Sequence, residues 1–389
     1  MEVVFMKKLL CLFVVALLLL PQVVQADSVL NSKASCAMLM DYYTGDILYE
    51  HKIDEQVPIA SVTKVMTILL CLEAEAAGQL SFEEEMVVSK AAAGMGGSQI
   101  FLDANAKYKV ADLMKSIVVS SANDSSVAMA ERLCGTQGAF VDAMNARAQQ
   151  LGMTNTAFKN CTGLPEAGHV STARDVGIMS RELLKHEAFF TWSTIWTDEM
   201  PHPGGRTTMM SNTNRLIRFY DGADGIKTGS TSEAKYCLSA TAARGDMRLI
   251  SVVLGAPTTD IRFDEARALL DYGFNTYASV HIVRADSVPE NEIFVNHGRI
   301  KYILAYPEQD YTITAKRGET DGYTLAFEAL PNVTAPIRKG DCVGEIQVLK
   351  DGAVIKTINA LAMQDVEKAG VLDIFHWLLR QFIHQPLAY

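Results

Sequence analysis

Residues 58–70 constrain this chain most, because they combine the pattern of a buried helix with two side chains suited to nucleophilic chemistry. Apolar residues recur there at helical spacing, which predicts a helix that begins near Ser61, shortly after Pro58. Residues three apart share one face of a helix, so the Ser61 hydroxyl and the Lys64 amine can meet. A lysine kept in a dry pocket can be neutral enough to take the proton of a serine. The stretch therefore predicts an acyl-transfer site of the Ser-x-x-Lys type.

This spacing is weak evidence by itself, because it recurs at Ser232 and Lys235. The second pair falls at the start of a predicted strand, where residues three apart point to opposite faces. The alternative for the first pair is a helix-capping serine beside a solvated lysine. Only further motifs can decide between the two interpretations.

Residues 1–26 are typical of a secretory signal peptide. Lys7 and Lys8 precede an apolar run, and small residues before position 27 fit cleavage after Ala26. The run is short for a membrane-spanning helix, although a retained anchor is the alternative. We therefore expect an exported protein.

The composition argues against one class of partner and does not decide whether the cysteines form disulfides. The formal net charge is −10 and no basic run occurs, which argues against nucleic-acid binding. Beyond Cys11 in the signal, the remaining cysteines are scattered and include no C-x-x-C pair. Some could pair in an oxidising compartment, but most fit small buried residues better than a disulfide framework.

Residues 27–276 are predicted to form an α/β (α+β) domain. Strands from both ends of this segment build one antiparallel sheet, and helices lie between them in the sequence. We expect strands at 36–41, 47–51, 236–242 and 248–254. We expect helices from Ser61 and at 110–119, 125–134, 140–151, 176–185 and 262–274, and a Pro/Gly/polar loop at 200–213.

The rest of the chain changes character twice. Residues 280–362 alternate in short strands with polar turns, which predicts a small all-β domain. Residues 365–389 predict an amphipathic helix that lies on a membrane surface, with docking on the β domain or on a partner as the alternative. Its apolar residues fall within about half of a helical wheel: Val371, Leu372, Ile374, Phe375, Leu378, Leu379, Phe382 and Ile383.

A second candidate motif is Ser121-Ala122-Asn123. Ser121 can relay a proton between Lys64 and a leaving amine, and Asn123 can hold the lysine and a substrate amide in register. The alternative is a cap at the end of a helix.

The third candidate motif is Lys227-Thr228-Gly229. The positive charge of Lys227 can depress the pKa of Lys64 and attract a carboxylate, to which Thr228 offers a hydroxyl. Gly229 lets a strand edge pass close to a substrate backbone. The alternative is a surface turn, but the order, spacing and context of the three motifs agree with one another.

With these motifs, the chain resembles the low-molecular-mass penicillin-binding D-alanyl-D-alanine carboxypeptidases, serine peptidases of the S11 type. The resemblance covers nearly the whole chain, from the signal to the terminal amphipathic helix. It extends to four further stretches: Thr44-Gly45, Thr162-Gly163-Leu164, Ala173-Arg174-Asp175 and Met247-Arg248-Leu249-Ile250.

The resemblance implies a penicillin-binding/β-lactamase-like catalytic domain that works without a cofactor or metal. Ser61 would be acylated by the penultimate D-alanine of a peptidoglycan stem peptide, releasing the terminal D-alanine, and β-lactams would inhibit it. The site would face the outer side of the bacterial cytoplasmic membrane or the cell-wall space, where it would remodel the wall.

The same resemblance assigns two further roles. The oxyanion hole would consist of the N–H groups of Ser61 and Ser230, and Arg262 would help to bind the terminal carboxylate. Ser230 departs from the family, because many relatives carry histidine or tyrosine directly after the Lys-Thr-Gly motif.

Four other kinds of protein could carry parts of this motif set. A class A β-lactamase needs a second carboxylate, but no Leu-Asn follows Glu166 in a Glu-x-x-Leu-Asn arrangement. A zinc peptidase needs clustered histidines, which neither His186 nor His169 offers. A DD-endopeptidase would use the same machinery on cross-linked stems, and a non-catalytic cell-wall-binding scaffold would carry an inactive site; both remain alternatives.

Overall fold

The structure is a computed structural model of the 389-residue chain, and it describes residues 30–286 and 292–375. The predicted signal peptide, residues 1–26, lies outside the described residues. So does most of the predicted terminal helix, residues 376–389.

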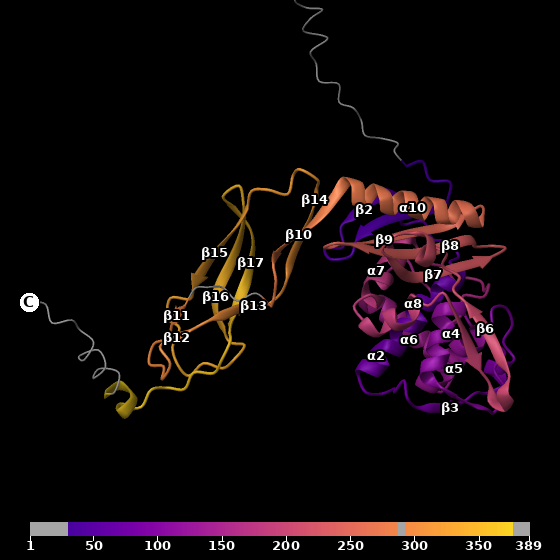
Figure 1. Ribbon diagram of the computed structural model, residues 1–389, viewed down its shortest axis with the longest axis horizontal. Helices are drawn as coiled ribbons and strands as arrows, with labels where there is room; N and C mark the ends of the chain where they lie inside the picture. Colours follow the sequence, from indigo (N-terminus) through magenta and orange to yellow (C-terminus); the bar gives the residue numbers. More distant parts are fainter. Residues whose placement is uncertain (1–29, 287–291, 376–389) are drawn as a thin grey trace, which may run out of the picture. The chain divides into compact units, whose positions relative to one another are not determined.

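The first domain is built on a five-stranded antiparallel sheet in the order β2-β1-β9-β8-β7 (Figure 1). Two strands come from the start of the domain, β1 (Cys36–Asp41) and β2 (Ile47–His51). Three come from its end, β7 (Ala223–Thr231), β8 (Lys235–Arg244) and β9 (Met247–Ala256). β1 pairs with β9 from Cys36↔Leu254 to Asp41↔Leu249. The predicted sheet, contributed by both ends of the segment, is therefore confirmed.

The two faces of this sheet carry different helices. Alternate residues of a strand point to opposite faces, and β1 follows this rule. Leu39 lies against Gly273 of α10 (Thr259–Thr276), whereas Met38 and Met40 lie against Gly177 of α7 (Ala173–Leu183). Figure 1 shows α10 along one face and the helical layer beyond the other.

The helical layer holds most of the buried apolar side chains of this domain. Apart from α7, its elements include the short helices α3 (Lys90–Ala93), α8 (Phe190–Ser193) and α9 (Leu216–Phe219). The longer helices match the predicted ones closely: α2 (Lys64–Ala76), α4 (Val110–Ser120), α5 (Asn123–Cys134) and α6 (Gln137–Gln150). A small antiparallel pair, β3 (Glu85–Val87) with β4 (Lys107–Lys109), borders this layer.

The predicted loop at residues 200–213 is wrong. The chain there forms a hairpin of β5 (Thr197–Pro201) and β6 (Thr207–Ser211), paired from Thr197↔Ser211 to Pro201↔Thr207. Met200 and Met210 are fully buried and hold the hairpin on the domain, while most other side chains of the two strands face solvent. Of the Pro and Gly residues that indicate a loop, those at 203–205 form the turn between the strands, and Pro201 ends β5.

The described residues beyond α10 form the expected all-β domain. Its main sheet has the order β13-β17-β16-β15, accompanied by two two-stranded ladders, β10-β14 and β11-β12. The strands are β10 (Tyr277–Val283), β11 (Ile293–Phe294), β12 (Tyr302–Ile303), β13 (Ala305–Pro307), β14 (Tyr311–Lys316), β15 (Tyr323–Ala329), β16 (Cys342–Lys350) and β17 (Ala353–Ala362).

Packing of this domain continues past the predicted limit at residue 362. Val366 is buried, belongs to the apolar core and forms a bridge with Ile337. Residues 371–375 are helical, with Val371 84% and Leu372 74% exposed. None of the described helices is both long and apolar enough to cross a bilayer.

Candidate active site

Ser61 lies at the start of the central helix, as the sequence predicts. A short 3-10 helix, η1 (Ala60–Thr63), leads directly into α2. Ala60 has a φ of 47°, a left-handed conformation that is costly for a residue with a side chain. This bend brings the half-buried Ser61 to the N-terminal end of the helix.

Lys64 lies one turn further and is completely buried. Its Nζ is 3.1 Å from Ser61 Oγ, 2.7 Å from Asn123 Oδ1 and 2.7 Å from the carbonyl oxygen of Thr162. Burial lowers the pKa of Lys64 to about 7, although the nearby Cys161 and Asp124 oppose this shift. A neutral amine has two N–H bonds and one lone pair. The two carbonyl oxygens can take the N–H bonds, which leaves the lone pair for the Ser61 hydroxyl.

The second motif lies between α4 and α5. Ser121 has a φ of 62° and ends α4 in the left-handed conformation. Its Oγ is buried and finds no hydrogen-bond partner among the described residues. Such an orphaned hydroxyl is costly unless a ligand or substrate uses it. Ser121 is therefore free to serve a substrate group.

Asn123 is held so that its carbonyl oxygen faces Lys64. Its Nδ2 donates to the Gly96 carbonyl at 2.7 Å, and its backbone N–H donates to Ser98 at 2.7 Å. A Cβ on Gly97 would lie 2.8 Å from Asn123 Nδ2, so a side chain there would displace the amide. Gly97 thus helps to keep a site residue in place.

The third motif lies on β7, against the turn that carries Ser61. A Cβ on Gly229 would come within 2.8 Å of the Ile59 carbonyl and 2.9 Å of the Ser61 nitrogen. Only glycine allows this approach of the strand to the Ser61 backbone. Thr228 donates its hydroxyl to Thr213 at 2.6 Å, and Ser230, the next residue after Gly229, is exposed.

Lys227 is a second fully buried lysine. Its Nζ donates to the Thr228 carbonyl at 3.2 Å. Burial first, and then the charges of Lys64 and Arg262, hold the pKa of Lys227 well below its usual range. From the sequence we attribute the lowered pKa of Lys64 partly to Lys227. In the structure burial is the principal cause of that shift, and the charge of Lys64 contributes to the lowered pKa of Lys227. A further positive charge beside either amine would therefore be unfavourable, whereas an anionic or neutral group can bind there.

Arg262 reaches this strand from α10. One terminal nitrogen donates to the carbonyls of Gly229 and Cys237, both at 3.3 Å. Its Nε is buried without a partner among the described residues, and the guanidinium lies 4.5 Å from the Phe263 ring centroid. Burial lowers the pKa of Arg262 to about 10, so it stays charged at neutral pH. This cation has unused donor capacity beside Gly229.

The sequence analysis missed Thr162 as a partner of Lys64. Its carbonyl lies in a turn closed by Asn160, whose Oδ1 accepts from the backbone N–H groups of Thr162 at 3.2 Å and Gly163 at 2.7 Å. An Asn-x-Thr-Gly stretch, here residues 160–163, is a signal for such a turn. The sequence could have revealed the turn, but not the direction of its carbonyl.

The rival sites gain no support from the geometry. Glu166 is exposed and accepts a hydrogen bond from Asn160 Nδ2 at 3.0 Å. Within the described ranges, no group of three His, Cys, Asp or Glu side chains could hold a metal ion. His169 and His202, the buried histidines, use both ring nitrogens in hydrogen bonds within the protein.

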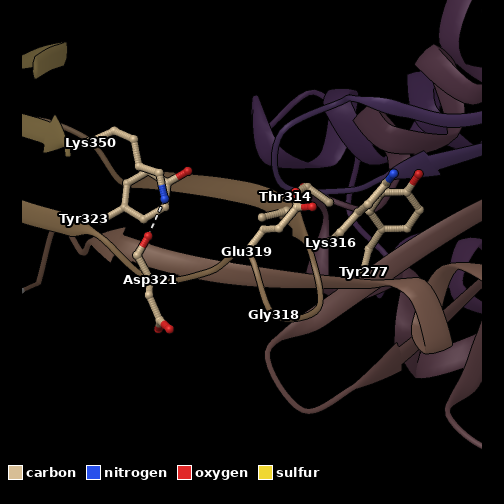
Figure 2. Close-up of a pocket in the computed structure, with 9 residues that line it drawn as sticks. Tyr277, Thr314, Lys316, Gly318, Glu319, Asp321, Tyr323 and Lys350 are labelled. Carbon is tan, nitrogen blue, oxygen red and sulfur yellow. Dashed lines mark hydrogen bonds between the residues drawn. The ribbon is translucent and has the colours of Figure 1, made fainter. Parts of the chain in front are cut away.

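The C-terminal domain contains a cavity of about 630 Å³ that holds none of the predicted site residues. Figure 2 shows Lys350 and Tyr323 at one end and Lys316 and Tyr277 at the other. Lys350 lies over the Tyr323 ring, 4.2 Å from its centroid, and donates to the Asp321 carbonyl. No group here resembles the Ser61–Lys64 pair.

Two family models match the chain, and together they span most of it. The D-alanyl-D-alanine carboxypeptidase (Peptidase S11) model matches residues 22–258, and the model of the C-terminal domain of penicillin-binding protein 5 matches residues 277–368.

Two relatives of the same family are similar to this chain over nearly its whole length. The D-alanyl-D-alanine carboxypeptidase DacF of Bacillus subtilis is 39% identical over 89% of this chain and 89% of its own length. DacC of Escherichia coli, of the same description, is 34% identical over 94% and 91%.

Solved structures show the same fold. Penicillin-binding protein 5 of Haemophilus influenzae superposes with a TM-score of 0.71 at 31% identity, covering 88% of this chain and 99% of that one. Penicillin-binding protein D2 of Listeria monocytogenes, in an ampicillin-bound form, matches with a TM-score of 0.54 at 33% identity over 63% of this chain and 99% of its own. With its three motifs gathered at one end of α2, this chain belongs to the D-alanyl-D-alanine carboxypeptidase family of serine peptidases.

Proposed function

We propose that this protein removes the terminal D-alanine from peptidoglycan stem peptides through an acyl-enzyme on Ser61. The observation that carries the proposal is the buried Lys64 amine, which has two carbonyl acceptors and the Ser61 hydroxyl as its neighbours. This arrangement provides a base for the serine at neutral pH.

The reaction follows from these positions in two steps. Lys64 takes the proton of Ser61 as Oγ bonds to the penultimate D-alanine carbonyl, and the N–H groups of Ser61 and Ser230 bind the resulting oxyanion. The peptide C–N bond then breaks, and Ser121 relays the proton from Lys64 to the leaving amine of D-alanine, which leaves Lys64 neutral again. Water enters, gives a proton to Lys64 and attacks the ester, so Ser61 recovers its hydrogen and the shortened peptide leaves.

Substrate recognition is assigned to the edge of β7. The free carboxylate of the terminal D-alanine would bind to Arg262, to the Lys227 amine, whose charged form it would favour, and to the Thr228 hydroxyl, which would turn from Thr213. The Arg262 guanidinium stays charged and has spare donor capacity, so it suits a carboxylate better than a neutral amide. This preference favours a carboxypeptidase over an enzyme that cuts inside cross-linked stems.

We also propose that the protein is exported and held at the outer face of the cytoplasmic membrane by its C-terminal segment. The signal-like start of the sequence supports export. The exposure of Val371 and Leu372 supports a lipid-facing segment, because side chains of this size are seldom left so bare.

Labelling with benzylpenicillin tests the central assignment. A β-lactam presents a strained amide that resembles the substrate terminus, so intact mass should rise by one penicillin and peptide mapping should place it on Ser61. Ser61→Ala should stay folded and form no adduct. Ser180→Ala is the matched control, because Ser180 is a buried serine that bonds Ser239 rather than a site residue. An adduct that persists on another residue of Ser61→Ala would overturn the proposal.

A further inference from the structure

His169 is a buried histidine whose two ring nitrogens have unlike partners. Nδ1 lies 3.1 Å from the backbone nitrogen of Lys159, and Nε2 lies 2.7 Å from Thr63 Oγ1. A backbone N–H can only donate, so Nδ1 must be the acceptor and the ring proton must sit on Nε2. His169 therefore donates to Thr63, the residue that directly precedes Lys64.

This bond is one of three that fasten the 158–169 loop to the start of α2. Thr67 Oγ1 donates to the Cys161 carbonyl at 2.7 Å, and Lys64 Nζ donates to the Thr162 carbonyl at 2.7 Å. The helix partners Thr63, Lys64 and Thr67 span little more than one turn. The loop and the helix start are therefore held together as a unit.

The loop cannot shift by a small amount without disturbing the nucleophile. A Cβ on Gly163 would lie 1.9 Å from the Ala60 carbonyl and 2.9 Å from the Ser61 nitrogen, so the loop backbone touches the turn before Ser61. The Thr162 carbonyl that orients Lys64 lies in the same tight turn. Contacts that fix the position of this loop therefore also fix the hydrogen bond between the Thr162 carbonyl and Lys64 Nζ.

We propose that His169 is a positioning residue for acylation: by bonding Thr63 and the Lys159 N–H together, it keeps the Thr162 carbonyl on the Lys64 amine. The inference rests on the proposed function of Ser61 and Lys64. His169 contacts neither the substrate nor Ser61, so its effect on acylation is indirect, through the position of the 158–169 loop.

The surroundings keep His169 in the required neutral form. The pKa of His169 is lowered to about 4, mainly by burial; the Glu166 carboxylate opposes this shift and the Lys159 ammonium adds to it. Two uncharged groups also contact the ring: the Thr63 hydroxyl and the edge of Phe158, at 5.8 Å between centroids. The ring is therefore a fixed donor and acceptor near neutral pH.

His202 provides a matched control elsewhere in the same domain. It is also buried, bonds Tyr108 through Nδ1 at 2.9 Å and Thr208 through Nε2 at 2.9 Å, and makes an edge contact with the Tyr108 ring. Neither partner touches Lys64. Replacing His202 should cost stability without altering the base.

The experiment measures the second-order rate of acylation by a fluorescent penicillin against pH, together with the melting temperature. His169→Ala should lower the plateau rate by about tenfold to a hundredfold, as small misplacements of catalytic groups do. Because water would reach Lys64, the midpoint of its acidic limb should move above pH 7. His202→Ala should lower the melting temperature and leave the midpoint in place.

Two further variants keep the test decisive if His169→Ala does not fold. His169→Gln keeps a donor near the Nε2 position and should recover most of the rate. Thr63→Val removes the same bond from the other side, should shift the midpoint in the same direction, and should not add fully to His169→Ala.

The outcomes separate this inference from the proposed function. If the wild type is acylated on Ser61 but His169→Ala, His169→Gln and Thr63→Val all keep its rate and midpoint, His169 is merely structural. If the wild type is not acylated on Ser61, the proposed function itself fails, whatever the His169 variants do.

Discussion

Lys64 and Lys350 are the same residue type in two very different settings. Lys64 is completely buried at the start of α2, with two carbonyl acceptors and the Ser61 hydroxyl around its amine. Lys350 is half-buried at the rim of the cavity in Figure 2, where it also bonds a carbonyl and lies over an aromatic ring. Removal from water, rather than contact with a carbonyl, is what leaves a lysine amine unprotonated near neutral pH, so that it can accept a proton.

The contrast extends to the two domains. Buried polar and charged residues, including Asn123, Asp124 and Arg262, all belong to the first domain. The described residues beyond 276 bury only apolar side chains, together with glycine and proline. Burying polar groups costs free energy unless they are satisfied, so their concentration in one domain marks the region that is shaped for chemistry.

The largest expected effect comes from removing the buried lysine. Lys64→Ala should lower the rate of acylation by benzylpenicillin by about 10²- to 10⁴-fold, because Ser61 loses its general base. Lys350→Ala should change the rate by less than about twofold. Stopped-flow or fluorescent-penicillin kinetics on both variants measures this, and equal losses would erase the distinction between the two lysines.

Two glycines on crowded strands, one in each domain, allow a second comparison. A Cβ would lie 2.8 Å from a backbone carbonyl both at Gly229 on β7 and at Gly344 on β16. Gly229→Ala should push β7 away from Ser61 and lower acylation by about a hundredfold.

Gly344→Ala is the control for this pair, since it should destabilise the C-terminal domain by a similar steric clash. Its acylation rate at 25 °C should stay close to that of the wild type, while its thermal unfolding shifts. A Gly229→Ala protein that keeps normal acylation would show that the strand edge does not matter to the nucleophile.

Sequence reasoning reached the catalytic motifs because their chemistry resides in side chains. Ser61, Lys64 and Asn123 could be named from residue type and spacing, and the structure brings all three together. The Thr162 carbonyl could not be named, because any residue supplies a backbone carbonyl and only the fold directs it.

The same limit explains the wrong loop at residues 200–213. Its Pro and Gly residues indicate turns, and the two strands on either side carry few apolar residues. Two methionines hold that hairpin on the domain, and the contacts that bury Met200 and Met210 come from segments distant in sequence. By contrast, the bounds predicted for β1 and β2 match the observed ones, because short apolar stretches and the turn between them are local signals.

Arg262 should show a smaller and more selective effect. Arg262→Ala should lower kcat/KM by about tenfold to a hundredfold on a peptide that ends in D-Ala-D-Ala, since it removes a charged donor to the carboxylate. The C-terminally amidated peptide should lose much less. Equal losses on both peptides would mean that Arg262 acts only by bonding the Gly229 and Cys237 carbonyls.

The pH dependence of acylation follows from the burial of Lys64. The lone pair that accepts the Ser61 proton exists only on the neutral amine, and the pKa of Lys64 is about 7. The acylation rate of the wild type should therefore level off above pH 7 and fall about tenfold for each pH unit below it. Lys350→Ala should keep this midpoint. A midpoint near 10 would show that Lys64 is solvated.

The smallest expected effect on catalysis comes from deleting the C-terminal segment. Val366 belongs to the core of the β domain, so the truncation is best made after Lys368, which leaves that packing intact. Each apolar side chain buried at a lipid interface contributes about 1.5–3 kcal/mol, so losing Val371, Leu372 and the residues beyond should abolish membrane binding. The truncated protein should keep kcat/KM on a soluble peptide within about twofold, yet no longer co-sediment with phosphatidylglycerol/phosphatidylethanolamine vesicles.

Val371→Asp with Leu372→Asp in the full chain should weaken co-sedimentation with these vesicles without loss of activity. A truncated protein that unfolds or loses activity on the soluble peptide would instead place this segment in the folded core.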